Sequence, residues 1–202
     1  NAYGVLAYSS SSSNSFEKSE LDINNSIIRT AGIGATGLFT SIGKATNTSD
    51  SSIAVHGNSI VDTNNSSAHA IDARSQAGLA KVSVDAGGQI ITRGTGSYAI
   101  SAVSNQAAGG VMVTNAGTLI SSLADGINAI GRNGGTTIIN TGSITGGASG
   151  MYAQNSGTGV INISSDGNIT GQKGYGVFAR NYTSPSDVTV TQSSGIIEGN
   201  TT

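Results

Sequence analysis

Apolar residues recur along this chain in short alternating stretches, and two phrases built on them return at a regular interval. Residues 114–129 (TNAGTLISSLADGINA) and 139–153 (INTGSITGGASGMYA) share the order Asn-x-Gly-x-(Ile/Leu), then Gly-(Ile/Met)-x-Ala. Repetition with a period of about 20–50 residues is typical of solenoids, in which each unit covers the apolar face of the next. The pattern therefore predicts stacked repeats.

The apolar residue of the second phrase marks a first anchor in each repeat. Seven such anchors occur, 24 to 33 residues apart, at Val5, Leu38, Ile71, Ile100, Ile127, Met151 and Val177. The residues two positions later are almost all alanine, namely Ala7, Thr40, Ala73, Ala102, Ala129, Ala153 and Ala179. Alternation with period two indicates a β-strand, and a column of small side chains indicates a confined position.

The apolar residue of the first phrase marks a second anchor, expected at Ile27, Ile60, Ile90, Leu119, Ile144, Ile169 and Ile197. A third alternating stretch precedes each second anchor, at residues 20–24, 52–56, 81–85, 111–115, 137–140, 160–164 and 187–191. Gly, Asn and Ser separate these stretches, and Gly and Asn tolerate the left-handed backbone of a sharp corner. We therefore predict an all-β parallel β-helix of about seven rungs, three short strands per rung, as one body over residues 1–202.

The repeats differ in length mainly between the first strand and the second. Residues 8–20, 43–52 and 74–81 are longer than the later equivalents 131–136 and 154–159. Insertions on one edge of a solenoid often mark its binding face, so we expect Phe16, Glu17 and Lys18 in the longest insertion to contact a partner. Because the repeats run almost to both ends, without a polar cap, we expect the chain to be a piece of a longer protein.

Composition narrows the possible partners. The net charge is −2, charged residues make up 10%, and the nine Lys and Arg are scattered. Nucleic acid is therefore not an expected partner, since it needs clustered positive charge. No stretch approaches the roughly 20 apolar residues of a membrane helix, so we expect no direct membrane insertion. The first residues do not form a signal peptide, and export would need a signal elsewhere.

The repeats resemble the passenger domains of bacterial autotransporters (type V secretion). The likeness is strongest at residues 115–131, 140–153 and 166–179 and weaker in the first two repeats. It implies a right-handed β-helix that is displayed on, or released from, a Gram-negative cell. Most such passengers are adhesins, autoaggregation factors or other host-interaction proteins. The expected partners are a host cell-surface or matrix protein, a glycan, or another copy of the chain.

An enzyme of the β-helix class would need carboxylates close enough to act on one sugar, about 5–10 Å apart in glycosidases. The alignment places Asp22 and Asp85 in one column, but two turns apart. Asp72 and Asp125 lie in different columns on different turns. We therefore expect no catalytic residues. A glycan lyase or hydrolase of the tailspike type stays open as an alternative, as does a pure structural spacer.

Metal and nucleophile chemistry are not indicated by the sequence. The chain has no Cys, and its two histidines, His56 and His69, have no Asp-rich loop beside them. A Gly-x-Ser-x-Gly nucleophile elbow is also missing. We expect no metal site and no cofactor.

One column contains residue types suited to binding. Two positions before each first anchor stand Tyr3, Thr36, His69, Tyr98, Asp125, Ser149 and Tyr175. Tyr and His combine an apolar body with a polar tip, which suits contacts with sugars or proteins. We predict that Tyr3, His69, Tyr98 and Tyr175 contact a partner, with His69 and Tyr98 side by side. The other interpretation is that this column only covers the core, which is also the favoured role of Phe39, Tyr152 and Phe178.

Overall fold

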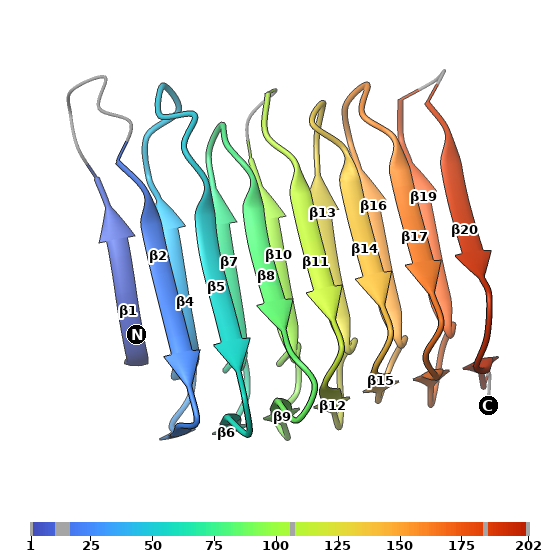
Figure 1. Cartoon of the computed structure of the whole chain (residues 1–202), viewed down its shortest axis with the longest axis horizontal. Coiled ribbons are helices and arrows are strands. Elements are labelled where there is room, and N and C mark those ends of the chain that lie inside the picture. The colour runs from blue at the N-terminus through green and yellow to red at the C-terminus, as the bar shows by residue number, and fades with distance from the viewer. Residues whose placement is uncertain (1, 11–16, 106–107, 184–185, 201–202) are drawn as a thin grey trace.

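The described part of the chain is an all-β solenoid. The computed structural model describes residues 2–10, 17–105, 108–183 and 186–200, and its elements are all β-strands. The chain winds along one axis, so that its two ends lie at opposite ends of the rod (Figure 1). Strands that are three apart in sequence pair in parallel, which gives three sheets with three strands per turn.

The first sheet contains β1 (Tyr3–Ser9), β4 (Thr36–Ile42), β7 (Ile71–Ser75), β10 (Ile100–Ser104), β13 (Ile127–Gly131), β16 (Met151–Asn155) and β19 (Val177–Asn181). The second contains β2 (Ser19–Asn24), β5 (Ser51–His56), β8 (Ala80–Val84), β11 (Val111–Asn115), β14 (Thr136–Asn140), β17 (Ile161–Ser165) and β20 (Val188–Gln192). The third contains β3 (Ile27–Ala31), β6 (Ile60–Asn64), β9 (Gln89–Thr92), β12 (Thr118–Ser121), β15 (Ser143–Gly146), β18 (Ile169–Gly171) and β21 (Ile197–Gly199).

Each sheet stacks seven strands, so the chain makes six full turns between β1 and β19. Strands of the second sheet run opposite to those of the first, and the short third sheet closes the bottom edge (Figure 1). The two longest connections join the first sheet to the second, as expected for the first two repeats, but the insertion expected at residues 74–81 is not seen, because residues 76–79 alone connect β7 to β8. Residues 43–50 connect β4 to β5, whereas only residues 132–135 connect β13 to β14.

The first anchors stack as predicted. The register of the first sheet pairs Val5, Leu38, Ile71, Ile100, Ile127, Met151 and Val177 in one continuous column. The small residues two positions later also pair turn by turn, from Ala7 to Ala179. Both columns point into the core, because Ile100 and Ala102 are completely buried. The expected first strand of each repeat is confirmed.

The predicted second anchors are wrong by one residue in the first two repeats. Val61, not Ile60, pairs with Ile90, and Ile28, not Ile27, pairs with Val61. Ile27 is exposed and Val61 is fully buried. Two consecutive apolar residues stand at both places, so the sequence pattern alone does not say which of them points inward. A slip of one residue along a strand exchanges the buried and exposed sets.

The core is thin and aliphatic. Its inward columns are formed almost entirely by Ile, Val, Leu and Ala from the three sheets. Every turn is covered by the turns on either side, so neighbouring turns supply both the backbone hydrogen bonds and the apolar contacts. At the two ends of the rod, inward residues such as Val5 and Val177 are only partly buried.

The corner from the third sheet back to the first changes its chemistry along the rod. In the longer early corners, Thr30, Thr63 and Thr92 donate a hydroxyl hydrogen bond to a carbonyl five residues ahead, at 2.6–2.7 Å. The next residue in this column is Ser121, and its hydroxyl donates to the Ser97 carbonyl oxygen at 2.9 Å. In the last two corners the column holds glycine, where a Cβ on Gly146 would clash with the Ser149 carbonyl oxygen.

A buried polar ladder closes the corner between the second and third sheets. Asn115 Nδ2 donates to Asn140 Oδ1 at 2.8 Å, and Asn140 Nδ2 donates to Ser165 Oγ at 3.1 Å. All three residues are buried. Stacked side chains of this kind link consecutive turns and satisfy corner groups that water does not reach.

The register predicts opposite effects for two neighbouring isoleucines of β14. Ile138 is fully buried, whereas Ile139 is 37% exposed. Ile138→Ala should lower the free energy of unfolding by about 2–5 kcal/mol, because it leaves a cavity in the aliphatic column. Ile139→Ala should cost about 1 kcal/mol or less. Urea denaturation of both variants checks this, and equal costs would contradict the assigned register.

The asparagine ladder makes a second stability prediction. Asn140→Ala should cost about 1–3 kcal/mol, because the buried Asn115 and Ser165 side chains each lose a partner. Asn162, on the outward face of the neighbouring strand, is exposed, and Asn162→Ala should leave stability nearly unchanged. Thermal denaturation of the two variants compares the same chemical change at a buried and an exposed position.

Candidate functional site

The outward face of the first sheet carries nearly buried polar residues in its middle turns. The residues just after the first anchors point outward and form a column of Leu6, Phe39, Asp72, Ser101, Asn128, Tyr152 and Phe178. Asp72, Ser101 and Asn128 are nevertheless only 2%, 3% and 7% exposed. Their counterparts on the second sheet in the same turns, Lys81, Met112 and Thr137, are half-buried.

Two columns of side chains flank this floor. One consists of Tyr3, Thr36, His69, Tyr98, Asp125, Ser149 and Tyr175, at the entrances of the strands. The other consists of Tyr8, Ser41, Arg74, Val103, Ile130, Gln154 and Arg180, two positions beyond the floor. We call the floor and its two flanking columns the front trough.

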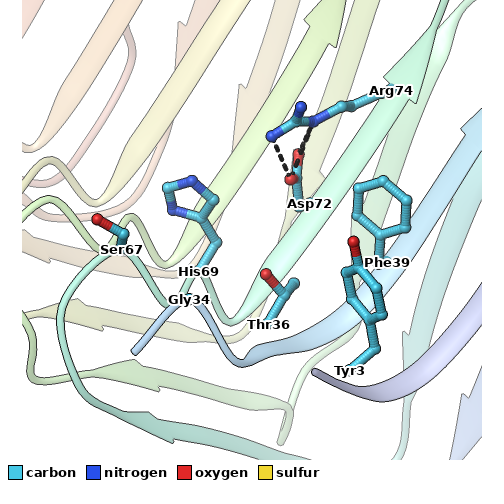
Figure 2. Close-up of a pocket in the computed structure, with 8 residues that line it drawn as sticks. All are labelled: Tyr3, Gly34, Thr36, Phe39, Ser67, His69, Asp72 and Arg74. Atoms are coloured by element: carbon cyan, nitrogen blue, oxygen red, sulfur yellow. Dashed lines mark hydrogen bonds and ion pairs between the residues drawn. The ribbon is translucent and has the colours of Figure 1, made fainter. Parts of the chain in front are cut away.

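The front trough deepens into a small cavity at its N-terminal end. The cavity has a volume of about 190 Å³ and lies among Tyr3, Phe39, His69, Asp72 and Arg74 (Figure 2). Since a water molecule occupies about 30 Å³ in the liquid, the cavity has room for about six waters. It is therefore too small for a whole drug-sized ligand and suits one part of a longer one.

An ion pair forms one side of this cavity. Arg74 Nε donates to both carboxylate oxygens of Asp72 at 3.0 Å, and Arg74 Nη2 lies 2.8 Å from Asp72 Oδ2. This hydrogen bonding to Asp72 holds the pKa of Arg74 above its ordinary value. The guanidinium also lies 5.7 Å from the centre of the Phe39 ring. A nearly buried carboxylate needs such a partner, and the pairing leaves no net charge here.

His69 and Tyr98 stack beside the floor, and their predicted proximity is confirmed. Their ring centres are 5.0 Å apart and the rings are nearly parallel, at 9°. The Tyr98 backbone N–H donates to His69 Nδ1 at 3.2 Å, so Nδ1 accepts and carries no proton. Burial lowers the pKa of His69, which favours this neutral ring.

A second carboxyl group lies in the same flanking column. Asp125 Oδ1 accepts a hydrogen bond from the Ser149 backbone N–H at 2.9 Å, and burial raises the pKa of Asp125. Asp125 precedes β13, whereas Asp72 lies on β7, and β10 stands between those strands. At about 4.8 Å per turn, the two carboxyls are separated by roughly 10 Å along the axis alone.

Aromatic rings gather at both ends of the front trough. At the N-terminal end, Tyr3 and Phe39 have ring centres 4.8 Å apart. At the C-terminal end, Phe178 stacks on Tyr152 at 5.1 Å and meets Tyr175 at 5.2 Å. The middle turns between these groups hold the small polar floor. The front trough thus has a polar middle and a group of aromatic rings at each end.

The seven residues predicted to contact a partner do not lie on one surface. Tyr3, His69, Tyr98 and Tyr175 all lie along the front trough. Glu17 lies instead beside the end of β1, where its carboxylate accepts a hydrogen bond from Ser9 Oγ at 3.2 Å. Lys18 is exposed next to it, and Phe16 is outside the described residues. Since β1 runs about 20 Å from Tyr3 to Ser9, the loop and the column form separate surfaces.

The sequence pattern missed the polar floor and Arg74 as site residues. Asp72, Ser101 and Asn128 each follow a first anchor, so their shared column was available from the alignment. Their burial was not, because an outward position on a strand is ordinarily exposed to solvent. Only the structure shows that these three residues are nearly buried.

The structure also corrects the predicted column of Asp22 and Asp85. Asp22 pairs with Ala54 and then Ser83, so Asp85 belongs to a different column. Both aspartates nevertheless contact His56, whose Nδ1 lies 2.6 Å from Asp85 and whose Nε2 lies 3.5 Å from Asp22. His56, which had no obvious partner in the sequence, therefore connects three consecutive turns of the second sheet.

Other surface features offer less chemistry. Among the described residues, no three His, Cys, Asp or Glu side chains gather into a metal site. The same residues include no helix that could cross a membrane. A larger hollow of about 640 Å³ beside β21 is lined by residues such as Thr170, Ile197 and Glu198 and contains no aromatic ring.

Comparison of the chain with protein-family models, with curated proteins and with solved structures found no match.

The His56 cluster predicts a pH-dependent contribution to stability. The hydrogen bond to Asp85, together with the charges of Asp85 and Asp22, raises the pKa of His56, although burial opposes this. A histidine with a raised folded-state pKa stabilises fully below its ordinary pKa of about 6.5, and this stabilisation is lost as pH rises through the folded-state value. The stability difference between the native chain and His56→Gln should therefore shrink as pH rises.

Thermal denaturation of both proteins from about pH 5 to about pH 9 spans the ordinary histidine pKa and measures this difference. A difference that is constant across the range would show that the ion pairs contribute nothing. His69→Gln serves as the comparison, because burial lowers the pKa of His69. Its difference from the native chain should not shrink in the same way.

Proposed function

We propose that the chain is a non-enzymatic, extracellular binding rod of the autotransporter passenger type, and that the front trough is its binding surface. The rod is inferred to coil right-handed, because parallel strands joined by a crossover follow that hand in about 98% of known cases. Its site of action is the surface or surroundings of a Gram-negative cell. This location follows from the likeness of the repeats in sequence.

The observation that carries this proposal is the combination of side chains on the outward face of the first sheet. It places aromatic rings, an internally paired arginine and nearly buried polar groups along one side of a stiff rod. Aromatic residues and arginine are the types most enriched at the energetic centres of binding surfaces. The described residues of the other two sheets present no such combination in the same turns.

The shape of the surface favours binding spread along the rod. The cavity at Tyr3 and Arg74 is small, and the columns of the front trough continue along all seven strands of the first sheet. A ligand would therefore gain affinity from many modest contacts along several turns. The partners proposed for such a surface are a host cell-surface or matrix protein, a glycan, or another copy of the chain.

The proposal is tested by attaching the purified chain to beads. The beads are offered to epithelial cells, to immobilised fibronectin, collagen and laminin, and to beads carrying the same chain. We expect attachment in at least one arm, and we expect Tyr98→Ala to reduce it severalfold, because this ring forms part of the flanking column. Counting of attached beads by microscopy gives the readout.

Met112→Ala on the outward face of the second sheet is the matched control and should bind like the native chain. A Tyr98→Ala variant that keeps its melting temperature and attaches as strongly as the native chain would contradict the proposed surface. Attachment in none of the arms would favour a spacer role. Release of reducing sugars from any polysaccharide would instead favour an enzyme.

A further inference from the structure

Two of the three residues of the polar floor make no side-chain hydrogen bond to the rest of the described rod. Ser101 and Asn128 are 3% and 7% exposed and point outward. Among the described residues, neither side chain has a hydrogen-bond partner. A nearly buried hydroxyl and amide need partners, which water supplies when no ligand is bound. A ligand rich in hydroxyl groups could replace that water without loss.

The aromatic groups at the two ends add flat apolar surfaces at a defined separation. Phe39 lies on the second turn and Tyr152 on the sixth, so four turns separate them. At about 4.8 Å per turn, this separation is about 19 Å, the length of a short oligosaccharide. Sugar rings have apolar faces that stack on aromatic rings, and their hydroxyl groups project sideways.

The charges in the middle turns of the trough do not favour an anionic ligand. Arg74 is paired with Asp72 through three short contacts. Burial lowers the pKa of His69 and raises the pKa of Asp125, so both groups shift toward their neutral forms. The other arginine of the flanking columns, Arg180, lies at the C-terminal end, 4.1 Å from the centre of the Tyr182 ring.

From these features we infer that the front trough binds a neutral, extended glycan lying along the rod axis. Its rings stack on Phe39 at one end and Tyr152 at the other. Its hydroxyl groups bond to Ser101 and Asn128 between them, and the cavity beside Arg74 accommodates one terminal or branching ring. This inference rests on the proposed function and names the ligand class of that same surface.

Calorimetric titration with defined sugars tests the inference. The probes are neutral gluco-, manno- and galacto-oligosaccharides, compared with polygalacturonate and heparin fragments of similar length. We expect one neutral series to bind, with affinity rising with chain length until the ligand spans the trough. Phe39→Ala and Tyr152→Ala should each weaken binding by roughly tenfold, as expected for the loss of one stacking platform.

A second variant examines the floor with little change in shape. Asn128→Leu keeps the size of the side chain but removes its amide, and should weaken binding by several-fold to roughly tenfold. Asn162→Leu makes the same change on the outward face of the second sheet and should have no effect. Circular dichroism and melting temperature confirm that each variant is folded, so a loss of binding reports on the ligand site.

The outcomes separate the glycan inference from the proposed function. If the acidic polymers bind more tightly than every neutral sugar, the inference is overturned. If no sugar binds, but Phe39→Ala and Tyr152→Ala abolish attachment to a deglycosylated matrix protein, the ligand is a protein. In that case the inference fails and the proposed function stands. If these variants alter neither sugar binding nor attachment, both fail.

Discussion

In-register stacking of like side chains on successive turns is the interaction on which the rest of the rod depends. A parallel ladder places each residue directly above its counterpart, so Ile100 lies between Ile71 and Ile127. Backbone hydrogen bonds and aliphatic contacts therefore come from the same neighbours. This explains how a chain without cysteine or tryptophan, and with few other aromatic residues, forms a closed core.

The same register organises the outward face. Outward-facing side chains stack in columns just as the core side chains do. Because of this, small polar residues on three consecutive turns form a continuous floor. Asp72, Ser101 and Asn128 follow Ile71, Ile100 and Ile127, and larger residues flank them on both sides.

The sequence was sufficient for the parallel solenoid with three strands per turn and only partly for the site. The first anchors were predictable because Gly or Ala stands directly before each and a small residue stands two positions after it, while Ile27-Ile28 and Ile60-Val61 left the direction of two strands undecided. The flanking column of Tyr3, His69, Tyr98 and Tyr175 follows from spacing alone. The burial of Asp72 and the contacts of His56 depend on distances between turns and at corners, which residue types do not encode.

A coil held together only by its nearest neighbours has a consequence for how such a protein changes over generations. Duplication of a gene segment that encodes about 25 residues inserts one complete turn, and only the two turns on either side of it exchange a neighbour. Each inserted turn lengthens the front trough by about 4.8 Å. The length of the binding surface can therefore grow or shrink by whole turns. The side chains of the existing turns, and the contacts they offer to a ligand, are preserved.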